Sequence, residues 1–147
     1  MYLLDTNIVS LLDRRRQARV PELVAWLRKN GGFLFLSVIS LAEMETGVLK
    51  LRREDKHAKA DELDHLIGEI EVDFADRIIP VTSLIARRLA HIGARIFPRT
   101  IGWPDLVIAA TAEVNGLVIL TNNIRHFNPA GVHYIDPLAQ LPPDAEA

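Results

Sequence analysis

The chain of 147 residues contains no cysteine. This absence excludes disulfide bonds, a thiolate nucleophile and any zinc site built on cysteine ligands. It agrees with a reducing compartment, and we expect the protein in the cytoplasm. No apolar run approaches the ~18 residues of a membrane-spanning helix. No basic segment precedes the apolar start, which Asp5 interrupts, so we expect neither a signal peptide nor a membrane partner.

An excess of positive charge is also missing, because 17 Lys and Arg residues face 19 Asp and Glu residues and leave a formal net charge of −2. A nucleic-acid surface would therefore need a local group of arginines. The glycine patterns GxGxxG and GxxxxGK[ST] do not occur, so the sequence does not support a dinucleotide or P-loop site. An apolar content of 49% with 24% charged residues is typical of one globular domain with its own core.

Short apolar segments alternate with segments of helical character along the chain. Strands are predicted at residues 2–4, 33–37, 77–81, 117–121 and 133–135, and helices at 6–14, 20–30, 38–54, 56–72, 83–97 and 104–116. This alternation predicts an α/β fold with a parallel sheet covered on both faces. We expect three α/β/α layers, four or five strands, a single domain at 1–137 and a loose tail at 138–147.

Acidic side chains stand where such a sheet binds ligands, beyond the carboxyl ends of its strands. Asp5 follows the first strand, Glu43 lies in the helix after the second, and Asp105 opens the helix before the fourth. Each acid alone has an ordinary interpretation. Asp5 or Asp105 can cap or charge the start of a helix, and Glu43 can face solvent.

The three acids together indicate a metal site. Three carboxylates that converge on one crevice repel one another unless a cation holds them. No pair of histidines at ligand spacing accompanies them, so the oxygen ligands favour Mg²⁺, or else Mn²⁺, over zinc. A divalent cation held by carboxylates is the usual apparatus for hydrolysing phosphodiesters.

Three stretches carry a family resemblance: "YLLDTNIVS", "SVISLAEMETGV" and "WPDLVIAATAEVNGLVILTNNIRHF". They resemble the PIN-domain ribonucleases, and most closely the VapC/FitB-like toxins of bacterial type II toxin–antitoxin pairs. The resemblance implies a metal-dependent endoribonuclease that a small antitoxin neutralises, in a system whose antitoxin carries a DNA-binding domain. It implies metal ligation by Asp5, Glu43 and Asp105. It also implies catalytic or supporting polar roles for Asn7, Thr121 and Asn123.

The chain departs from this family pattern at His126, where many relatives carry a fourth acid. A second metal held by four acids is therefore in doubt, and His126 is interpreted either as a contact to substrate phosphate or as a surface histidine without a partner. Helical periodicity also disagrees with the family motif. A helical wheel places Glu45 among the apolar positions and Glu43 opposite them, whereas the motif selects Glu43, which we follow.

Contacts to RNA and to partners complete the hypothesis. Arg14, Arg15 and Arg16 near Asp5 are candidates for phosphate contacts, as are four arginines before Asp105, at Arg87, Arg88, Arg95 and Arg99. Trp103 can stack on a base, although a core position is expected for it. The apolar seam of the helices in 38–72 suggests a surface that buries a helix of the antitoxin, and a homodimer besides.

Two alternatives stay open on the sequence alone. A receiver-like α/β binding module also uses acids and Mg²⁺, but it would want a lysine after a late strand, where this chain has "TNN" at 121–123. A PIN-like domain that has lost catalysis is opposed by the three retained acids.

Overall fold

The computed structural model describes residues 1–145, apart from the side chain of Arg14. At its centre is a five-stranded parallel sheet with the strand order β3-β2-β1-β4-β5. The strands are β1 (Tyr2–Leu4), β2 (Leu34–Ser37), β3 (Ile78–Ile79), β4 (Val118–Leu120) and β5 (Tyr134–Ile135). Each lies within a predicted strand, so the expected parallel sheet is confirmed.

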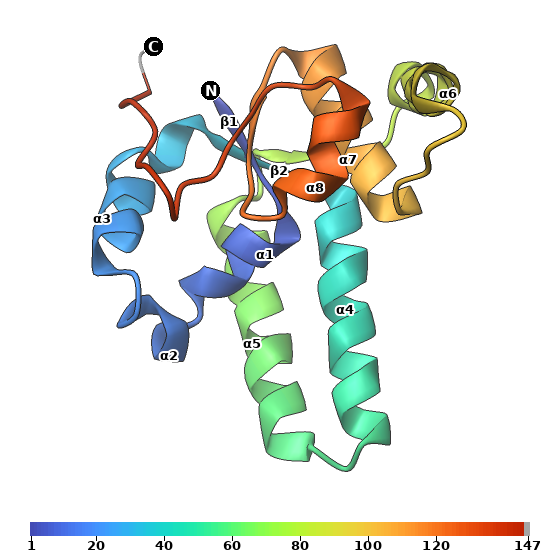
Figure 1. Ribbon diagram of the computed structural model, residues 1–147. Coiled ribbons are helices and arrows are strands. Elements are labelled where there is room, and N and C mark those ends of the chain that lie inside the picture. The colour runs from blue at the N-terminus through green and yellow to red at the C-terminus, as the bar shows by residue number, and fades with distance from the viewer. Residues whose placement is uncertain (146–147) are drawn as a thin grey trace.

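Helices cover both faces of this sheet (Figure 1). The longer ones are α3 (Pro21–Lys29), α4 (Val38–Arg53), α5 (His57–Asp73), α6 (Ser83–Ile96) and α7 (Trp103–Asn115). Successive residues of β1 point to opposite faces. Leu4 belongs to the core cluster that includes side chains of α3, α4 and α5, whereas Leu3 belongs to the cluster of α6 and α7. The three-layer α/β/α fold is therefore confirmed.

Short helices differ most from the sequence prediction. The predicted helix at 6–14 is divided into α1 (Thr6–Val9), the 3-10 turn η1 (Ser10–Leu12) and α2 (Arg14–Gln17). A short helix α8 (Ile124–Phe127), followed by η3 (Asn128–Ala130), was not predicted. Elements of four residues are too short to show a helical period, so the sequence gives no pattern for them.

Local signals set the ends of the helices that carry the acids. Ser37 caps α4, because its hydroxyl accepts a hydrogen bond from the backbone N–H of Ile39 at 3.4 Å. Helix α7 has Pro104 in its first turn and ends at Gly116, whose φ of 63° is left-handed. Helices α4 and α5 lie side by side and extend well beyond the sheet (Figure 1).

The tail was expected to be loose, and as far as Ala145 this is wrong. The Tyr2 hydroxyl donates a hydrogen bond to the carbonyl of Pro143 at 2.9 Å, and the Asn30 side chain accepts one from the backbone of Ala145 at 2.8 Å. Lys29 also pairs with Asp144. These contacts fasten the tail to β1 and to the end of α3. None of the helices within residues 1–145 is long and apolar enough to cross a membrane.

Candidate active site

Asp5 is held between the first strand and the first helix. Its Oδ1 accepts a hydrogen bond from the backbone N–H of Thr6 at 2.7 Å, which caps α1, and its Oδ2 accepts one from the Thr121 hydroxyl at 2.7 Å. The residue is only 5% exposed. Burial raises the pKa of Asp5 to about 6, against the two hydrogen bonds that lower it, and the charges of Asp105 and Glu43 raise it further. Asp5 thus caps α1 and is also a carboxyl group whose ionised form is disfavoured by burial.

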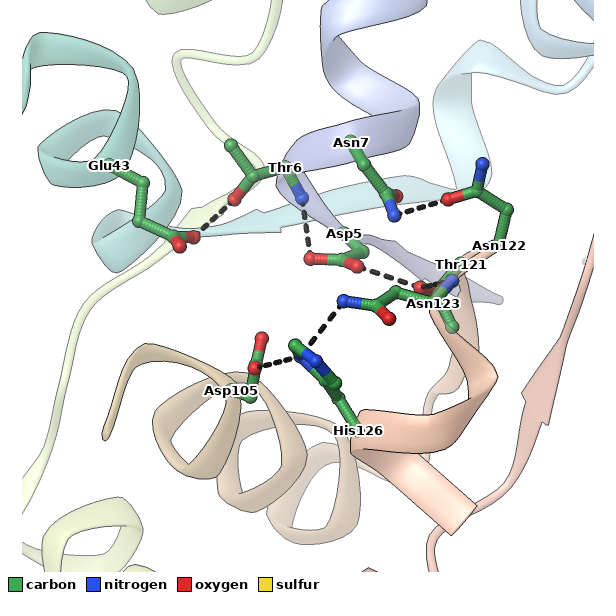
Figure 2. Close-up of polar contacts among 9 residues, drawn as sticks. All are labelled: Asp5, Thr6, Asn7, Glu43, Asp105, Thr121, Asn122, Asn123 and His126. Carbon is green, nitrogen blue, oxygen red and sulfur yellow. Dashed lines mark hydrogen bonds and ion pairs between the residues drawn. The ribbon is translucent and has the colours of Figure 1, made fainter. Parts of the chain in front are cut away.

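Glu43 faces the same space from α4. Its carboxylate accepts a hydrogen bond from the hydroxyl of Thr6, the residue next to Asp5 (Figure 2). Partial burial raises the pKa of Glu43; the bond from Thr6 lowers it, and the charge of Asp105 raises it. The position predicted from the family motif is therefore in the site.

The helical wheel was wrong about α4. Glu45 is exposed, and the buried line of the helix runs through Ser40, Met44 and Val48 instead. These residues recur every four positions, because α4 packs along the full length of α5. The wheel took the arc of apolar side chains as the buried face, whereas the buried face of α4 is set by its packing against α5.

Asp105 lies in the first turn of α7, opposite Asp5 (Figure 2). Its Oδ2 is 2.6 Å from Nδ1 of His126, and Asn123 Nδ2 is 2.8 Å from the same nitrogen. His126 is exposed, as the interpretation as a surface histidine expected, but it has a partner in Asp105 that the sequence did not indicate. The short helix α8 turns His126 toward Asp105, and the sequence carried no signal for that helix.

Polar residues after β4 complete the rim of the site. Thr121 is fully buried and its hydroxyl also accepts a hydrogen bond from the backbone N–H of Asn123 at 2.9 Å, while donating to Asp5. Asn7 donates through Nδ2 to the side chain of Asn122. Its own Oδ1 is buried and has no hydrogen-bond partner in the described part of the chain. An unpaired oxygen of this kind costs free energy unless water or a cation reaches it.

The three carboxylates of Asp5, Glu43 and Asp105 border one space, but they do not lie within metal-binding distance of a common point. Thr6 joins two of them, because its backbone N–H donates to Asp5 and its hydroxyl donates to Glu43, and Asp105 lies across from Asp5 (Figure 2). No Lys or Arg pairs with any of the three among the described side chains. Within residues 1–145, however, no three acidic or histidine side chains stand close enough to hold a metal ion as they are placed.

The three arginines near Asp5 that were predicted to contact phosphate differ in their surroundings. The side chain of Arg14 lies outside the described part of the structure. Arg15 pairs with Glu62, and Arg16 donates to the Ser10 hydroxyl at 3.0 Å. A cavity of about 650 Å³ reaches from Glu43 past both arginines. Arg15 and Arg16 therefore line the same cavity as Glu43, and their contact with phosphate stays a prediction.

The four arginines in α6 and in the loop after it fall into two groups. Arg88 and Arg95 both bind Glu113 of α7, at 3.3 and 2.9 Å, and these contacts hold the pKa of Glu113 below its usual value. They join two helices and are not free for substrate. Arg87 and Arg99 are exposed, and no ion pair or side-chain hydrogen bond engages them among the described residues. The core position expected for Trp103 is wrong, because this residue is 59% exposed.

Comparisons with known proteins agree with this architecture. The model of the PIN domain family matches residues 2–131. The toxin FitB of Neisseria gonorrhoeae is 33% identical over 141 residues, which cover 93% of this chain and 98% of FitB. VapC ribonuclease Y4jK of Sinorhizobium fredii is 29% identical over 140 residues, covering 93% and 97%. The crystal structure of FitAcB from Neisseria gonorrhoeae superposes with a TM-score of 0.72 at 33% identity and covers 94% of this chain and 99% of that one.

Proposed function

Because the chain belongs to the PIN domain family, we propose that it is an endoribonuclease that depends on a divalent metal ion and acts as the toxin of a toxin–antitoxin pair. The observation that carries this proposal is that Asp5, Glu43 and Asp105 border one space at the carboxyl end of the sheet, with Thr6 hydrogen-bonded to both Asp5 and Glu43. Relatives named as VapC ribonucleases and as a tRNA(fMet)-specific endonuclease support RNA as the substrate.

The residues around this space suit a hard cation such as Mg²⁺, with Mn²⁺ as the alternative. Each carboxylate oxygen of Asp5 accepts one hydrogen bond and keeps a second lone pair for a cation. The unpaired Oδ1 of Asn7 is a further, uncharged oxygen that could coordinate the ion. We propose Asp5, Glu43 and Asp105 as the ligands; an ion in contact with all three would have to draw them closer than they now stand. When bound, the cation supplies Lewis-acid stabilisation of the charge that develops on the phosphate.

The other polar residues hold the acids in place. Thr6 and Thr121 each fix one carboxylate through a hydroxyl, so that Glu43 and Asp5 face the substrate in a single orientation. His126 contacts Asp105 from the opposite side through Nδ1, and Asn123 lies against the same nitrogen, which either donates to Asp105 or accepts from Asn123. In a metal site, the removal of a residue that holds a ligand in place typically lowers metal affinity or activity by about 10- to 100-fold. Arg15 and Arg16 are proposed as phosphate contacts along the cavity that leads to Glu43.

A small antitoxin with a DNA-binding domain is the proposed partner, together with a second copy of the chain. The structure of FitAB bound to an IR36 DNA fragment, 28% identical with a TM-score of 0.65, supports this assignment. Large apolar side chains are exposed on the α4–α5 pair, with Leu49 at 53% and Val72 at 76%. These two side chains stand near opposite ends of the α4–α5 hairpin, so an antitoxin helix that covers both would lie along the pair. Neither a receiver-like nor an inactive module has a comparable observation in its favour.

The proposal is tested with a fluorogenic single-stranded RNA. The purified chain should cleave it with Mg²⁺ or Mn²⁺, lose the activity in EDTA and regain it when the metal is returned. Asp5→Asn should remove the activity, whereas the exposed Asp76→Asn serves as a matched control on the surface. Undiminished cleavage after exhaustive chelation would refute metal dependence, and a lack of cleavage with every divalent metal would refute the enzyme.

A further inference from the structure

The imidazole of His126 lies directly against one of the proposed metal ligands. Its Nδ1 is 2.6 Å from Oδ2 of Asp105, and Figure 2 shows the ring beside that carboxylate. Of the five histidines in the chain, His126 is the one that contacts a site acid among the described side chains. It therefore brings a nitrogen that can bind a metal ion to a site whose other candidate ligands are oxygens.

The two contacts of this nitrogen cannot both be hydrogen bonds. A neutral imidazole nitrogen carries either a proton or a lone pair, an ionised carboxylate only accepts, and an amide nitrogen only donates. With a proton, Nδ1 donates to Asp105 and leaves Nδ2 of Asn123, 2.8 Å away, without an acceptor. Without a proton, Nδ1 accepts from Asn123, and Asp105 receives no hydrogen bond from the ring. One partner is therefore unsatisfied in either tautomer.

A divalent cation would satisfy Nδ1 and the Asp105 carboxylate together, because the lone pairs of both can point at one positive charge. The spacing is close to what this requires, since neighbouring ligand atoms of an octahedral ion with bonds of about 2.1 Å lie about 3 Å apart. The His126 side chain is 47% exposed, against 15% for Asp105. Packing therefore leaves the ring room to turn toward an ion at Asp105.

We propose that His126 is itself a ligand of the divalent cation through Nδ1, next to Asp105, and that this nitrogen makes the site prefer Mn²⁺ to Mg²⁺. Mg²⁺ keeps to oxygen ligands and water, whereas the first-row transition ions, Mn²⁺ among them, also bind sites of mixed nitrogen and oxygen ligands. The inference rests on the proposed metal-dependent function and specifies the ion of that site. The competing interpretation is a histidine that only holds Asp105 in place. Such a residue would affect both ions alike, because both bind the same carboxylates.

The first test is equilibrium metal binding by the untagged wild type without RNA. Bound Mn²⁺ is measured by electron paramagnetic resonance, and Mg²⁺ by its competition with Mn²⁺. His126→Asp replaces the nitrogen ligand with a carboxylate, so the ratio of Mn²⁺ affinity to Mg²⁺ affinity should fall by about tenfold or more. His126→Asn keeps an N–H for Asp105 but has no nitrogen lone pair, and should lower the ratio as well. The matched control is His133→Ala, an exposed histidine, which should leave the ratio unchanged.

The second test detects the nitrogen ligand directly. Pulsed electron paramagnetic resonance of the bound Mn²⁺ should show the magnetic coupling of a coordinated imidazole nitrogen in the wild type. The coupling should vanish in His126→Asp and persist in His133→Ala. Asp5→Asn should weaken Mn²⁺ binding, which assigns the ion to this site. Equal melting temperatures of the metal-free His126 and His133 variants establish that each is folded.

The outcomes separate this inference from the function on which it rests. If the wild type binds Mn²⁺ and cleaves RNA, but lacks the nitrogen coupling or keeps its affinity ratio in His126→Asp, the inference is refuted and the enzyme stands. If the coupling is present and depends on His126, but no metal supports cleavage, the proposed function is refuted and the metal ligand stands. If neither ion binds the wild type at millimolar concentration, both are refuted.

Discussion

Removal of the buried charge of Asp5 should stabilise the metal-free protein at neutral pH. The pKa of this acid rises from 3.8 to about 6 on folding, mainly through burial. Two units correspond to about 3 kcal/mol of unfolding free energy. Asn at this position keeps the cap on α1, but the Thr121 hydroxyl loses the acceptor of its proton, which costs about 1–2 kcal/mol. The net expected gain for Asp5→Asn is therefore about 1–2 kcal/mol at pH 7.

The sign of the pH dependence is fixed by the direction of the shift. A raised folded pKa means that the folded protein holds the proton more tightly than the unfolded chain does. The stabilising contribution of the protonated acid is therefore complete below pH 3.8 and is lost as the pH rises through about 6. The free energy of unfolding of Asp5→Asn relative to the wild type should then increase by about 2–3 kcal/mol between pH 4 and pH 7. For a chain of this size, the relative melting temperature should increase by about 4–12 °C over the same range.

Thermal melts in EDTA at several pH values measure this difference. Asp13→Asn is the matched control, because Asp13 also caps a helix by accepting a hydrogen bond from the backbone of Arg15 at 2.8 Å. Added Mg²⁺ should stabilise the wild type at pH 7 and Asp5→Asn much less, because it binds the folded site. A difference between wild type and Asp5→Asn that stays flat across pH would refute the raised pKa and leave Asp5 as a cap only.

Three further changes test other parts of the site and fold. Glu43→Gln should abolish cleavage and Glu45→Gln should leave it intact, as measured by initial rates. The reverse result would show that Glu45, the acid chosen by the helical wheel, is the site residue. His126→Ala should lower the cleavage rate about tenfold or more by releasing Asp105, with the exposed His133→Ala as control; an unchanged rate would show that the contact is idle. Gly116→Ala should lower the unfolding free energy by about 1 kcal/mol, because its φ of 63° disfavours a side chain, without changing the rate per folded molecule; an unchanged melting temperature would contradict this reason.

The sequence predicted the sheet and the longer helices because their signals are local. Apolar runs such as "LVILT" and caps such as Ser37 act over a few residues, and the structure reproduces them. The sequence also singled out Asp5 and Asp105, because an isolated carboxylate in an apolar segment indicates a specific structural or functional role. What each acid binds in this chain remains a prediction.

The remaining features depend on contacts that no local pattern records. The partner of His126 is set by a helix of four residues, α8. The orientation of Glu43 depends on how α4 packs against α5, the next helix along the chain, and the helical wheel of α4 alone does not contain that contact. Exposure of Trp103 follows from the α6–α7 connection, which leaves the start of α7 uncovered. In each case tertiary packing overrides the expectation from a helical period or from hydrophobicity.

The central position of β1 has a consequence for the time at which the protein becomes active. Asp5 is synthesised near the start, but Thr121, which fixes its carboxylate, comes 116 residues later. At a synthesis rate of about 5–20 residues per second, this interval is about 6–23 s on the ribosome. β1 also has to wait for β4 as a neighbour in the sheet. The site around Asp5 is therefore incomplete until nearly the whole chain has emerged, and a partner that is already folded has that interval in which to reach the nascent chain.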